Sequence, residues 1–219
     1  MDVEQSSSVE SFIPFLVPAV FAAVLGLIIW GAVTAARRTR TNLQALADRL
    51  GLRLNAPGGT GIFALGRASL EGQSRGRPMR IYTYTTGSGK SRTTWCAISL
   101  TTRIPAGFSL KVSGENLFTK AGRVFGIDDV ETGDPSFDEK FYVKSKQASY
   151  IRAALIPEVR MRLLDALAKH RSFGTFTAEG GEVKYAEMGT FANAKILGRF
   201  PDMLEIAGDL AEIAEAYRD

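Results

Sequence analysis

A glycine-rich run that ends in lysine and serine, GSGKS at residues 87–91, has the composition of a phosphate-binding loop. Such a loop has its first glycine five residues before the second, and it opens a helix whose N-terminal amides hold the phosphates. Tyr84 occupies the first glycine position, and residues 92–98 have the β-branched and aromatic composition of a strand. The run is therefore predicted to be the polar tip of a hairpin. Phosphate binding by Lys90 is the alternative.

An acidic run suggests a site for a hard cation such as Mg²⁺ or Ca²⁺, because carboxylates are the ligands that these ions prefer. Its carboxylates are Asp128, Asp129, Glu131, Asp134 and Asp138. The run lacks the alternate-position ligands and the central glycine of an EF-hand loop. Asp134 stands before a proline, as in many turns, and Phe137 and Phe141 can anchor that turn in a core. We interpret Asp134, Phe137, Asp138 and Phe141 as a turn or interaction motif and predict no metal site.

Single histidine and cysteine residues leave few routes to catalysis. His170 lies beside Lys169 at the end of a predicted helix, where a cation suits the helix dipole. Cys96 alternates with Ile98 and Leu100 on one strand face, which is typical of a buried small hydrophobe. We therefore predict no catalytic residues, no cofactor and no enzyme activity.

Residues 12–36 form an uncharged apolar run, which is long enough to cross a hydrocarbon core of about 30 Å as a helix. The leader, residues 1–11, contains three acidic residues and no lysine or arginine, unlike a signal peptide. Trp30 is placed for the inner headgroup boundary, and the basic residues that follow the run are Arg37, Arg38 and Arg40. Because basic residues stay on the cytoplasmic side, we predict a single-pass membrane anchor with the N-terminus outside and the domain in the cytoplasm.

All 27 Lys and Arg residues follow this run and three of the 23 acidic residues precede it, so the chain from residue 37 on has a net charge of +7. We predict a basic juxtamembrane segment with a short helix and a linker at residues 37–61, followed by one soluble domain at residues 62–219. A single cysteine excludes an intrachain disulfide and agrees with a reducing cytoplasm. The partners expected from composition are the bilayer and a protein; no specific nucleic-acid module is indicated.

The pattern of the domain predicts strands followed by helices. Strands are expected between residues 62 and 112 and at 141–144, a helix from Pro157, and a hairpin over 173–188 that turns at Gly180-Gly181. A last helix is expected to begin at Pro201 and to pack on the sheet. The fold class is therefore α+β with a mainly antiparallel sheet, an arrangement reminiscent of pleckstrin-homology-like domains.

The segment TGDPSFDEKFYV at residues 132–143 resembles one in uncharacterised bacterial membrane-anchored proteins that carry a domain of unknown function. In those proteins a similar GD-x-x-FD-x-x-F-x-V follows an apolar anchor and several strands, and it precedes a helix that begins near P-E-x-R. The sequence PEVR at residues 157–160 fits this order. The resemblance covers about residues 40–170. It implies a bacterial source, and therefore an inner-membrane location for the predicted anchor, and it implies a shared fold. It brings no activity.

Three hypotheses follow for function. The first is a non-catalytic cytoplasmic module that binds a protein or senses a signal at the membrane. The second is binding to anionic lipid through basic loops, in which the juxtamembrane arginines join Arg75, Arg77, Arg80, Lys90 and Arg92 on one face. The third is an enzyme that uses Asp134 and Asp138 with a metal, or Lys90 with a nucleotide phosphate.

Overall fold

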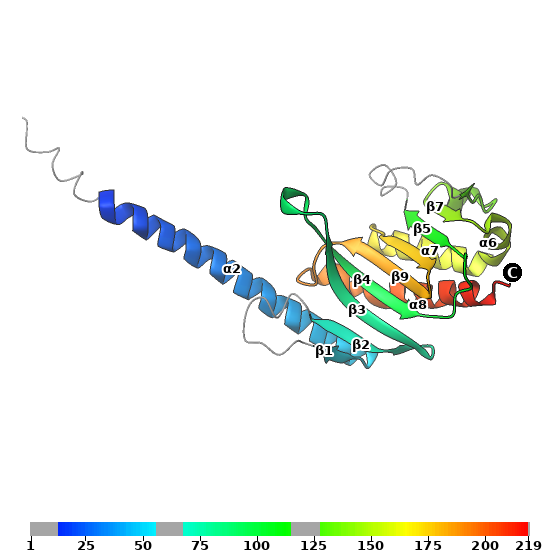
Figure 1. Cartoon of the computed structure of the whole chain (residues 1–219), viewed down its shortest axis with the longest axis horizontal. Coiled ribbons are helices and arrows are strands. Elements are labelled where there is room, and N and C mark those ends of the chain that lie inside the picture. The colour runs from blue at the N-terminus through cyan, green and yellow to red at the C-terminus, as the bar shows by residue number, and fades with distance from the viewer. Residues whose placement is uncertain (1–12, 56–67, 115–127, 219) are drawn as a thin grey trace, which may run out of the picture.

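A computed structural model of the chain describes residues 13–55, 68–114 and 128–218. A long helix, α2 (Ile13–Leu50), extends from an α+β domain, and the C-terminus lies at the opposite end of the molecule (Figure 1). The fold class predicted from the sequence is confirmed. The leader, residues 1–11, lies outside the described residues.

The helix α2 runs without a break from the apolar segment into the domain, where a separate short helix was predicted. No glycine or proline interrupts residues 32–50, so nothing in the sequence ends the helix earlier. The helix ends where Gly51 adopts a left-handed φ of 66°, and the Leu52 amide donates to the Ala47 carbonyl at 2.9 Å. This is the Schellman arrangement of a helix C-terminus.

The described strands form one nine-stranded sheet in the order β1-β2-β3-β4-β9-β8-β5-β7-β6, in which neighbouring strands pair antiparallel. The strands are β1 (Arg53–Asn55), β2 (Ser69–Ser74), β3 (Arg77–Thr86), β4 (Thr93–Thr101), β5 (Leu110–Gly114), β6 (Asp128–Asp129), β7 (Phe141–Ser145), β8 (Thr175–Glu179) and β9 (Glu182–Met188). Strand β1 lies within the segment for which a linker was predicted. The predicted boundary at residue 62 falls outside the described residues.

Both predicted hairpins are confirmed. Strands β3 and β4 pair from Met79↔Leu100 to Thr86↔Thr93, with the short 3-10 turn η1 (Gly89–Ser91) between them. Strands β8 and β9 pair through Glu179↔Glu182, which places the turn at Gly180 and Gly181. Both glycines there have positive φ, a conformation that glycine adopts without steric cost.

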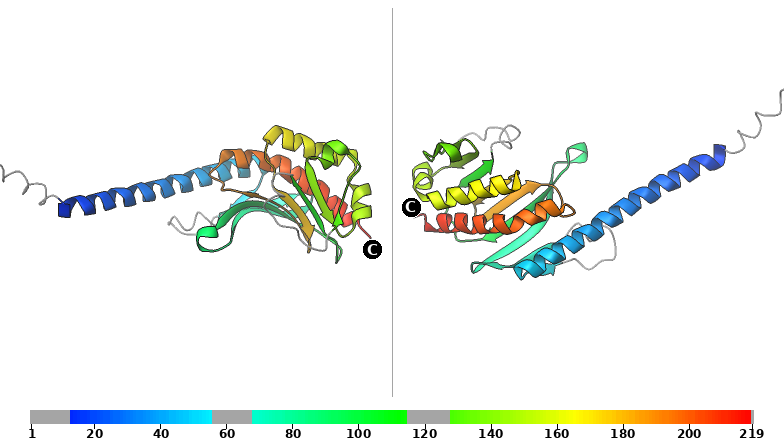
Figure 2. Two further views of the ribbon diagram at one scale, coloured as in Figure 1. Left: turned by 90° about the horizontal axis from the view of Figure 1, so that it is seen from above. Right: turned by 180° about the vertical axis from the view of Figure 1, so that it is seen from behind.

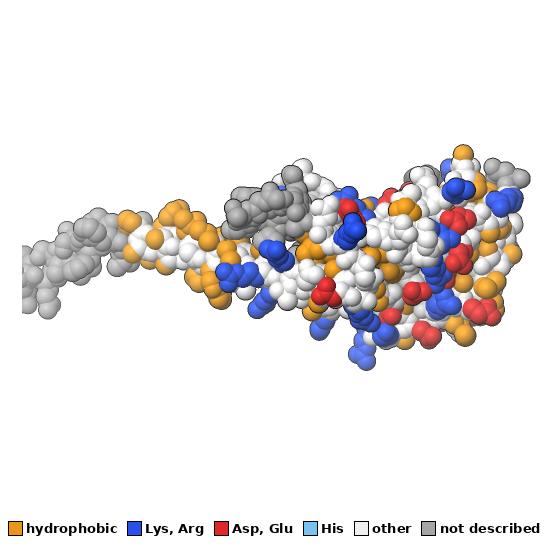
Figure 3. Space-filling view, turned by 90° about the horizontal axis from the view of Figure 1, so that it is seen from below, with side chains coloured by type: hydrophobic (Ala, Val, Ile, Leu, Met, Phe, Trp, Pro, Cys, Tyr) orange, Lys and Arg blue, Asp and Glu red, His pale blue; other side chains and the backbone are white. Residues whose placement is uncertain are grey.

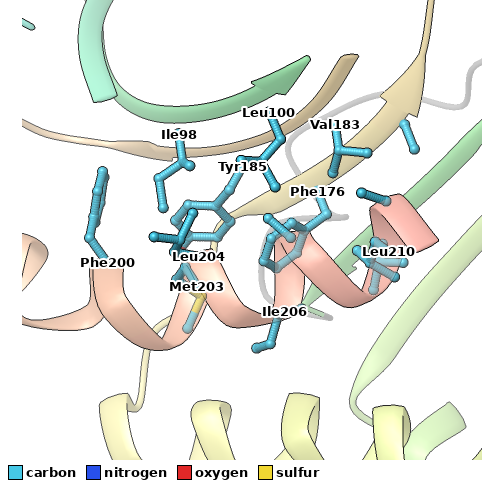
Figure 4. Packing of buried hydrophobic residues seen from close by; sticks show 14 of the residues in the cluster. Ile98, Leu100, Phe176, Val183, Tyr185, Phe200, Met203, Leu204, Ile206 and Leu210 are labelled. Atoms are coloured by element: carbon cyan, nitrogen blue, oxygen red, sulfur yellow. The ribbon is translucent and has the colours of Figure 1, made fainter. Parts of the chain in front are cut away.

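Helices cover one face of the sheet. They are α5 (Pro135–Asp138), α6 (Ala148–Ala154), α7 (Pro157–His170) and α8 (Ala194–Ala216). Helix α8 packs on the sheet and α7 packs beside α8, while none of the described helices covers the opposite face of β3 and β4 (Figure 2). Side chains of α8 meet Ile98, Phe176 and Tyr185 in the core, whereas Ile206 points toward α7 (Figure 4).

The prediction that the last helix begins at Pro201 is wrong by seven residues. Helix α8 begins at Ala194, and Asn193 caps it by accepting a hydrogen bond from the Lys195 amide at 3.0 Å. A proline inside a helix costs about 3 kcal/mol because it removes a backbone hydrogen bond. Burial of Ile196, Leu197 and Phe200 in the turns before it offsets that cost.

Candidate functional site

The described residues contain one helix that is long and apolar enough to cross a membrane. Its apolar window has a mean hydropathy of 2.2 and is only 6% buried, so these side chains have no protein environment. Trp30 is 69% exposed near the end of the apolar part. The three predicted interface arginines, Arg37, Arg38 and Arg40, are exposed directly after it, and Figure 3 shows Lys and Arg side chains where the helix meets the domain. This end of the molecule has the composition of a membrane interface.

The last turns of α2 belong to the core of the domain. Leu43, Leu46 and Ala47 are almost fully buried. The Asn42 side-chain amide donates to the Phe191 carbonyl at 2.9 Å, which ties α2 to the loop before α8. Because a helix is stiff along its axis, the domain is held at a fixed orientation relative to the apolar segment.

The helix-free face of the sheet carries a group of aromatic side chains, which we call the aromatic face: Tyr82, Tyr84 and Trp95, together with Arg80 and Lys184. Tyr84 and Trp95 stack with ring centroids 6.3 Å apart. Lys184 Nζ lies 4.0 Å from the centre of the Tyr84 ring, a cation–π contact. These aromatic rings are half-buried, so part of each remains accessible.

Sequence reasoning missed the aromatic face, although its signal is visible in β3. Met79 and Ile81 point into the core, and Tyr82 and Tyr84 alternate with them on the other side. Large apolar side chains on both faces of a strand indicate that the outer face is also a contact surface. Partly exposed aromatic residues beside cations are typical of protein interfaces.

The hypothesis of one basic face is contradicted for Arg75 and Arg77. Arg75 forms ion pairs with Glu205, Asp209 and Glu212 of α8, and Arg77 pairs with Glu215 of the same helix. Lys90 and Arg92 lie at the other end of the β3–β4 hairpin, about 30 Å away along ten residues of strand. Arg80 lies on the outer face of β3, between these two ends of the hairpin, and its Nε atom is 3.6 Å from Glu71 Oε1.

The contacts of Arg77 shape an open groove of about 1100 Å³ beside the turn between β2 and β3. Hydrogen bonds from Arg77 lower the pKa of Glu215 to about 2, and the Thr102 hydroxyl adds to this effect against the opposing influence of burial. Arg103 and Arg218 are exposed along the same groove. The arginines of the groove and Glu215 compensate one another in part. The net charge of the groove is therefore less positive than its number of arginines suggests.

The predicted motif at Asp134 is a capped turn. The Asp134 carboxylate accepts from the amides of Ser136 and Phe137, and the Asp138 carboxylate accepts from the Thr132 and Gly133 amides at 3.0 Å. Phe137 and Phe141 are buried and stack with centroids 4.9 Å apart. No group of three metal-ligating side chains meets within residues 13–55, 68–114 and 128–218. The motif therefore orders its own loop, and a role in interaction stays a prediction.

His170 and Cys96 both have structural surroundings. His170 Nε2 lies 2.6 Å from Asp202 Oδ2, which joins α7 to α8. Burial tends to raise the pKa of Asp202, but hydrogen bonds from Lys169 and His170 lower it below the usual value. Cys96 is fully buried, as predicted, and burial raises the pKa of its thiol to about 12, which keeps the thiol protonated.

Glu187 is a buried carboxylate beneath α8 that sequence reasoning did not identify. Only 5% of the residue is exposed, Arg199 pairs with one carboxylate oxygen, and the other oxygen, Oε1, has no hydrogen-bond partner among the described residues. Burial raises the pKa of Glu187 to about 7, although Arg199 opposes this effect. The alternation of Val183, Tyr185 and Glu187 on one strand face is the signal that would have placed it inside.

One solved structure has a similar arrangement of elements. It is the crystal structure of the mycobacterial trehalose monomycolate transport factor A, TtfA, with a TM-score of 0.50 over 82% of this chain and 93% of that chain. The two chains share a fold. Sequence identity is 13%, so the likeness concerns the fold alone. No protein-family model and no curated protein matches the sequence.

Proposed function

We propose that this chain is a single-pass anchor protein of a bacterial inner membrane whose cytoplasmic domain binds a protein partner without catalysing a reaction. The observation that carries the proposal is the unbroken helix α2, which joins an apolar segment with exposed side chains to the core of the domain. Such a connection fixes both the distance and the orientation of the domain at the membrane surface. A fixed position matters for a protein that must meet another membrane-bound protein.

The aromatic face supports this proposal. It presents two tyrosines and a tryptophan, the residue types that contribute most at protein interfaces, on a rigid sheet. The motif at Asp134 and Phe137 lies outside the aromatic face, and its side chains are engaged in the capping and packing of their own turn. The similar structure is described as a transport factor and not as an enzyme, which agrees with a non-catalytic role.

Site-specific photo-crosslinking tests the proposal. A photoreactive amino acid at Tyr84 of the full-length protein, irradiated in native membranes, is expected to give discrete protein adducts. The same amino acid at Met161, an exposed position on α7, serves as the control because it lies in the helical layer. Adducts at both positions in equal amount, or at neither position, would contradict a partner on the aromatic face.

The role of the anchor is tested separately with a chain that lacks residues 1–40. If adducts at Tyr84 persist at the same yield in this soluble form, the domain alone selects the partner. A loss of adducts shows that the membrane address determines the encounter. Detection of a hydrolytic or transfer activity that depends on Asp134 and Asp138 would replace the non-catalytic proposal with an enzymatic one.

A further inference from the structure

A groove of about 340 Å³ lies at the membrane end of the domain, between α2 and the projecting end of the β3–β4 hairpin. One side is formed by small residues of α2, including Ala32 and Thr39. The opposite side is formed by Thr85, Arg92 and Thr94, and Thr190 lies in the loop before α8. Small-molecule sites occupy about 300–1,000 Å³, so this groove fits a headgroup rather than a whole lipid.

The lining of the groove suits an oxyanion. The residues that line it include one cation, Arg92, several threonines, and no carboxylate. Arg92 is exposed and makes no ion pair within the described part of the chain, so its guanidinium is available to a ligand. A guanidinium pairs with phosphate through two parallel N–H donors, and nearby hydroxyls add further hydrogen bonds.

The groove opens at the level expected for lipid headgroups. Ala32, Ala35 and Ala36 line it, and they are the last residues of the apolar run predicted to span the bilayer. The exposed Arg37, Arg38 and Arg40 follow at once and favour anionic lipid in their vicinity. A lipid whose chains remain in the bilayer can therefore place its phosphate against Arg92 without leaving the membrane.

We propose that this groove binds the phosphate headgroup of an anionic phospholipid, with Arg92 as the principal contact and the threonine hydroxyls as secondary contacts. The site is separate from the aromatic face, because it opens on the helix-bearing side of the sheet. It depends on insertion of α2 in a membrane and does not depend on a protein partner. The bound headgroup would join α2 to the hairpin at the point where the domain meets the bilayer.

The test uses the full-length protein in mild detergent with dioleoyl phosphatidylglycerol, followed by native mass spectrometry. The variant Arg92→Gln is expected to retain this lipid about tenfold less than the native protein, since it loses the charged contact. The matched control is Lys90→Gln, which removes an exposed cation from the same hairpin at a position outside the groove lining. Retention within twofold of native for this control is expected.

Three outcomes would overturn the proposal. The first is an equal loss of lipid in both variants, which would indicate general attraction to the hairpin. The second is that the native protein retains dioleoyl phosphatidylcholine as well as it retains dioleoyl phosphatidylglycerol, which would show that the anionic headgroup is not selected. The third is complete displacement of the lipid by inorganic phosphate at millimolar concentration, which would make the groove a site for the free ion.

A second variant guards against a folding defect. Thr85→Val keeps the shape of the side chain but removes a hydroxyl from the groove, and we expect lipid retention to fall about threefold. Thermal unfolding within 2 °C of native identifies each variant as folded, and only folded variants are compared. If Thr85→Val and Arg92→Gln both unfold at the native temperature and both retain native amounts of lipid, the groove is not a headgroup site.

Discussion

Arg77 donates two hydrogen bonds to Glu215, from Nε to Oε1 at 2.9 Å and from Nη2 to Oε2 at 2.6 Å. The pair joins the start of β3 to the last turn of α8. Arg75, two residues earlier, bonds to three further acidic side chains of the same helix. Four carboxylates of α8 are therefore held by two arginines of one turn, which makes this contact the main polar link between the hairpin β2–β3 and the helical layer.

Replacement of Arg77 by Gln should lower the free energy of unfolding by about 1–2 kcal/mol, because a bidentate charged contact is lost at a site that is partly exposed to solvent. Urea unfolding of the full-length protein in detergent, followed by circular dichroism, measures the change. Arg49→Gln is the control, since Arg49 is exposed and makes no ion pair within the described residues. Equal destabilisation by both variants would contradict the special role of Arg77.

The same contact should produce an acid-side loss of stability. The pKa of Glu215 is about 2 in the folded chain against an ordinary value of 4.5, so the folded state binds fewer protons than the unfolded state between these values. Its contribution is complete above pH 4.5 and is lost as the pH falls toward 2. The difference in free energy of unfolding between the native protein and Glu215→Gln, measured from pH 6 to pH 2.5, should become smaller as the pH falls through this window. A flat difference would refute the assignment.

Glu187 should give the opposite dependence on pH. Its folded pKa is about 7 and its ordinary value is 4.5, so the folded state binds more protons between these values. Stability relative to Glu187→Gln should therefore fall as the pH rises from 4.5 to 7 and remain constant above pH 7.5. The expected fall is on the order of 2–3 kcal/mol. A rise over this range would show that the ion pair with Arg199 outweighs burial.

Two glycine-to-alanine substitutions should have effects of opposite sign. At Gly174 a Cβ atom would lie 2.2 Å from the Ala186 carbonyl oxygen, so Gly174→Ala must displace backbone and should destabilise the domain by more than about 2 kcal/mol. At Gly198, an exposed position of α8, a Cβ atom meets no other group within 4 Å. Gly198→Ala should therefore stabilise the protein by about 0.5–1 kcal/mol. The two melting temperatures provide the comparison, and any stabilisation at Gly174 would show that the close approach is relaxed in solution.

Leu43→Ala should loosen the junction between α2 and the domain. Leu43 is fully buried, and truncation of a buried leucine costs about 2–5 kcal/mol. Hydrogen exchange of the amides in residues 43–50 should become faster, with less change in the amides of β8 and β9. Leu27→Ala, within the apolar and exposed part of α2, is the matched control and should leave this exchange unaltered. Similar exchange in both variants would mean that α2 is not part of the core.

Local patterns in the sequence were sufficient for much of the fold. Alternation around Trp95 and Cys96 predicted β4, and Pro157 with the apolar positions that follow it predicted α7. Both hairpins were predictable because each of their turns contains glycines, and these glycines have positive φ. The start of α8 was not predictable from Pro201, because the cost of an internal proline is offset by tertiary packing that a linear pattern does not contain.

Long-range pairing explains what the sequence could not predict at the candidate sites. Arg75 and Arg77 resemble members of a basic patch until their partners on α8, more than 125 residues later, are known. Residues 92 and 94 reach the groove beside α2 only because the β3–β4 hairpin extends beyond the rest of the sheet. The turn at Asp134, by contrast, is formed mainly by local hydrogen bonds and an aromatic stack, and Arg160 of α7 adds one ion pair to Asp134.

The continuity of α2 has a mechanical consequence. About 14 residues of this helix lie beyond the apolar run, which corresponds to a rigid arm of about 21 Å. A change of about 10° in the tilt of the spanning part would displace the domain end of this arm by about 4 Å. The tilt of a spanning helix responds to bilayer thickness. The lipid composition of the membrane therefore affects the distance between the aromatic face and the membrane surface.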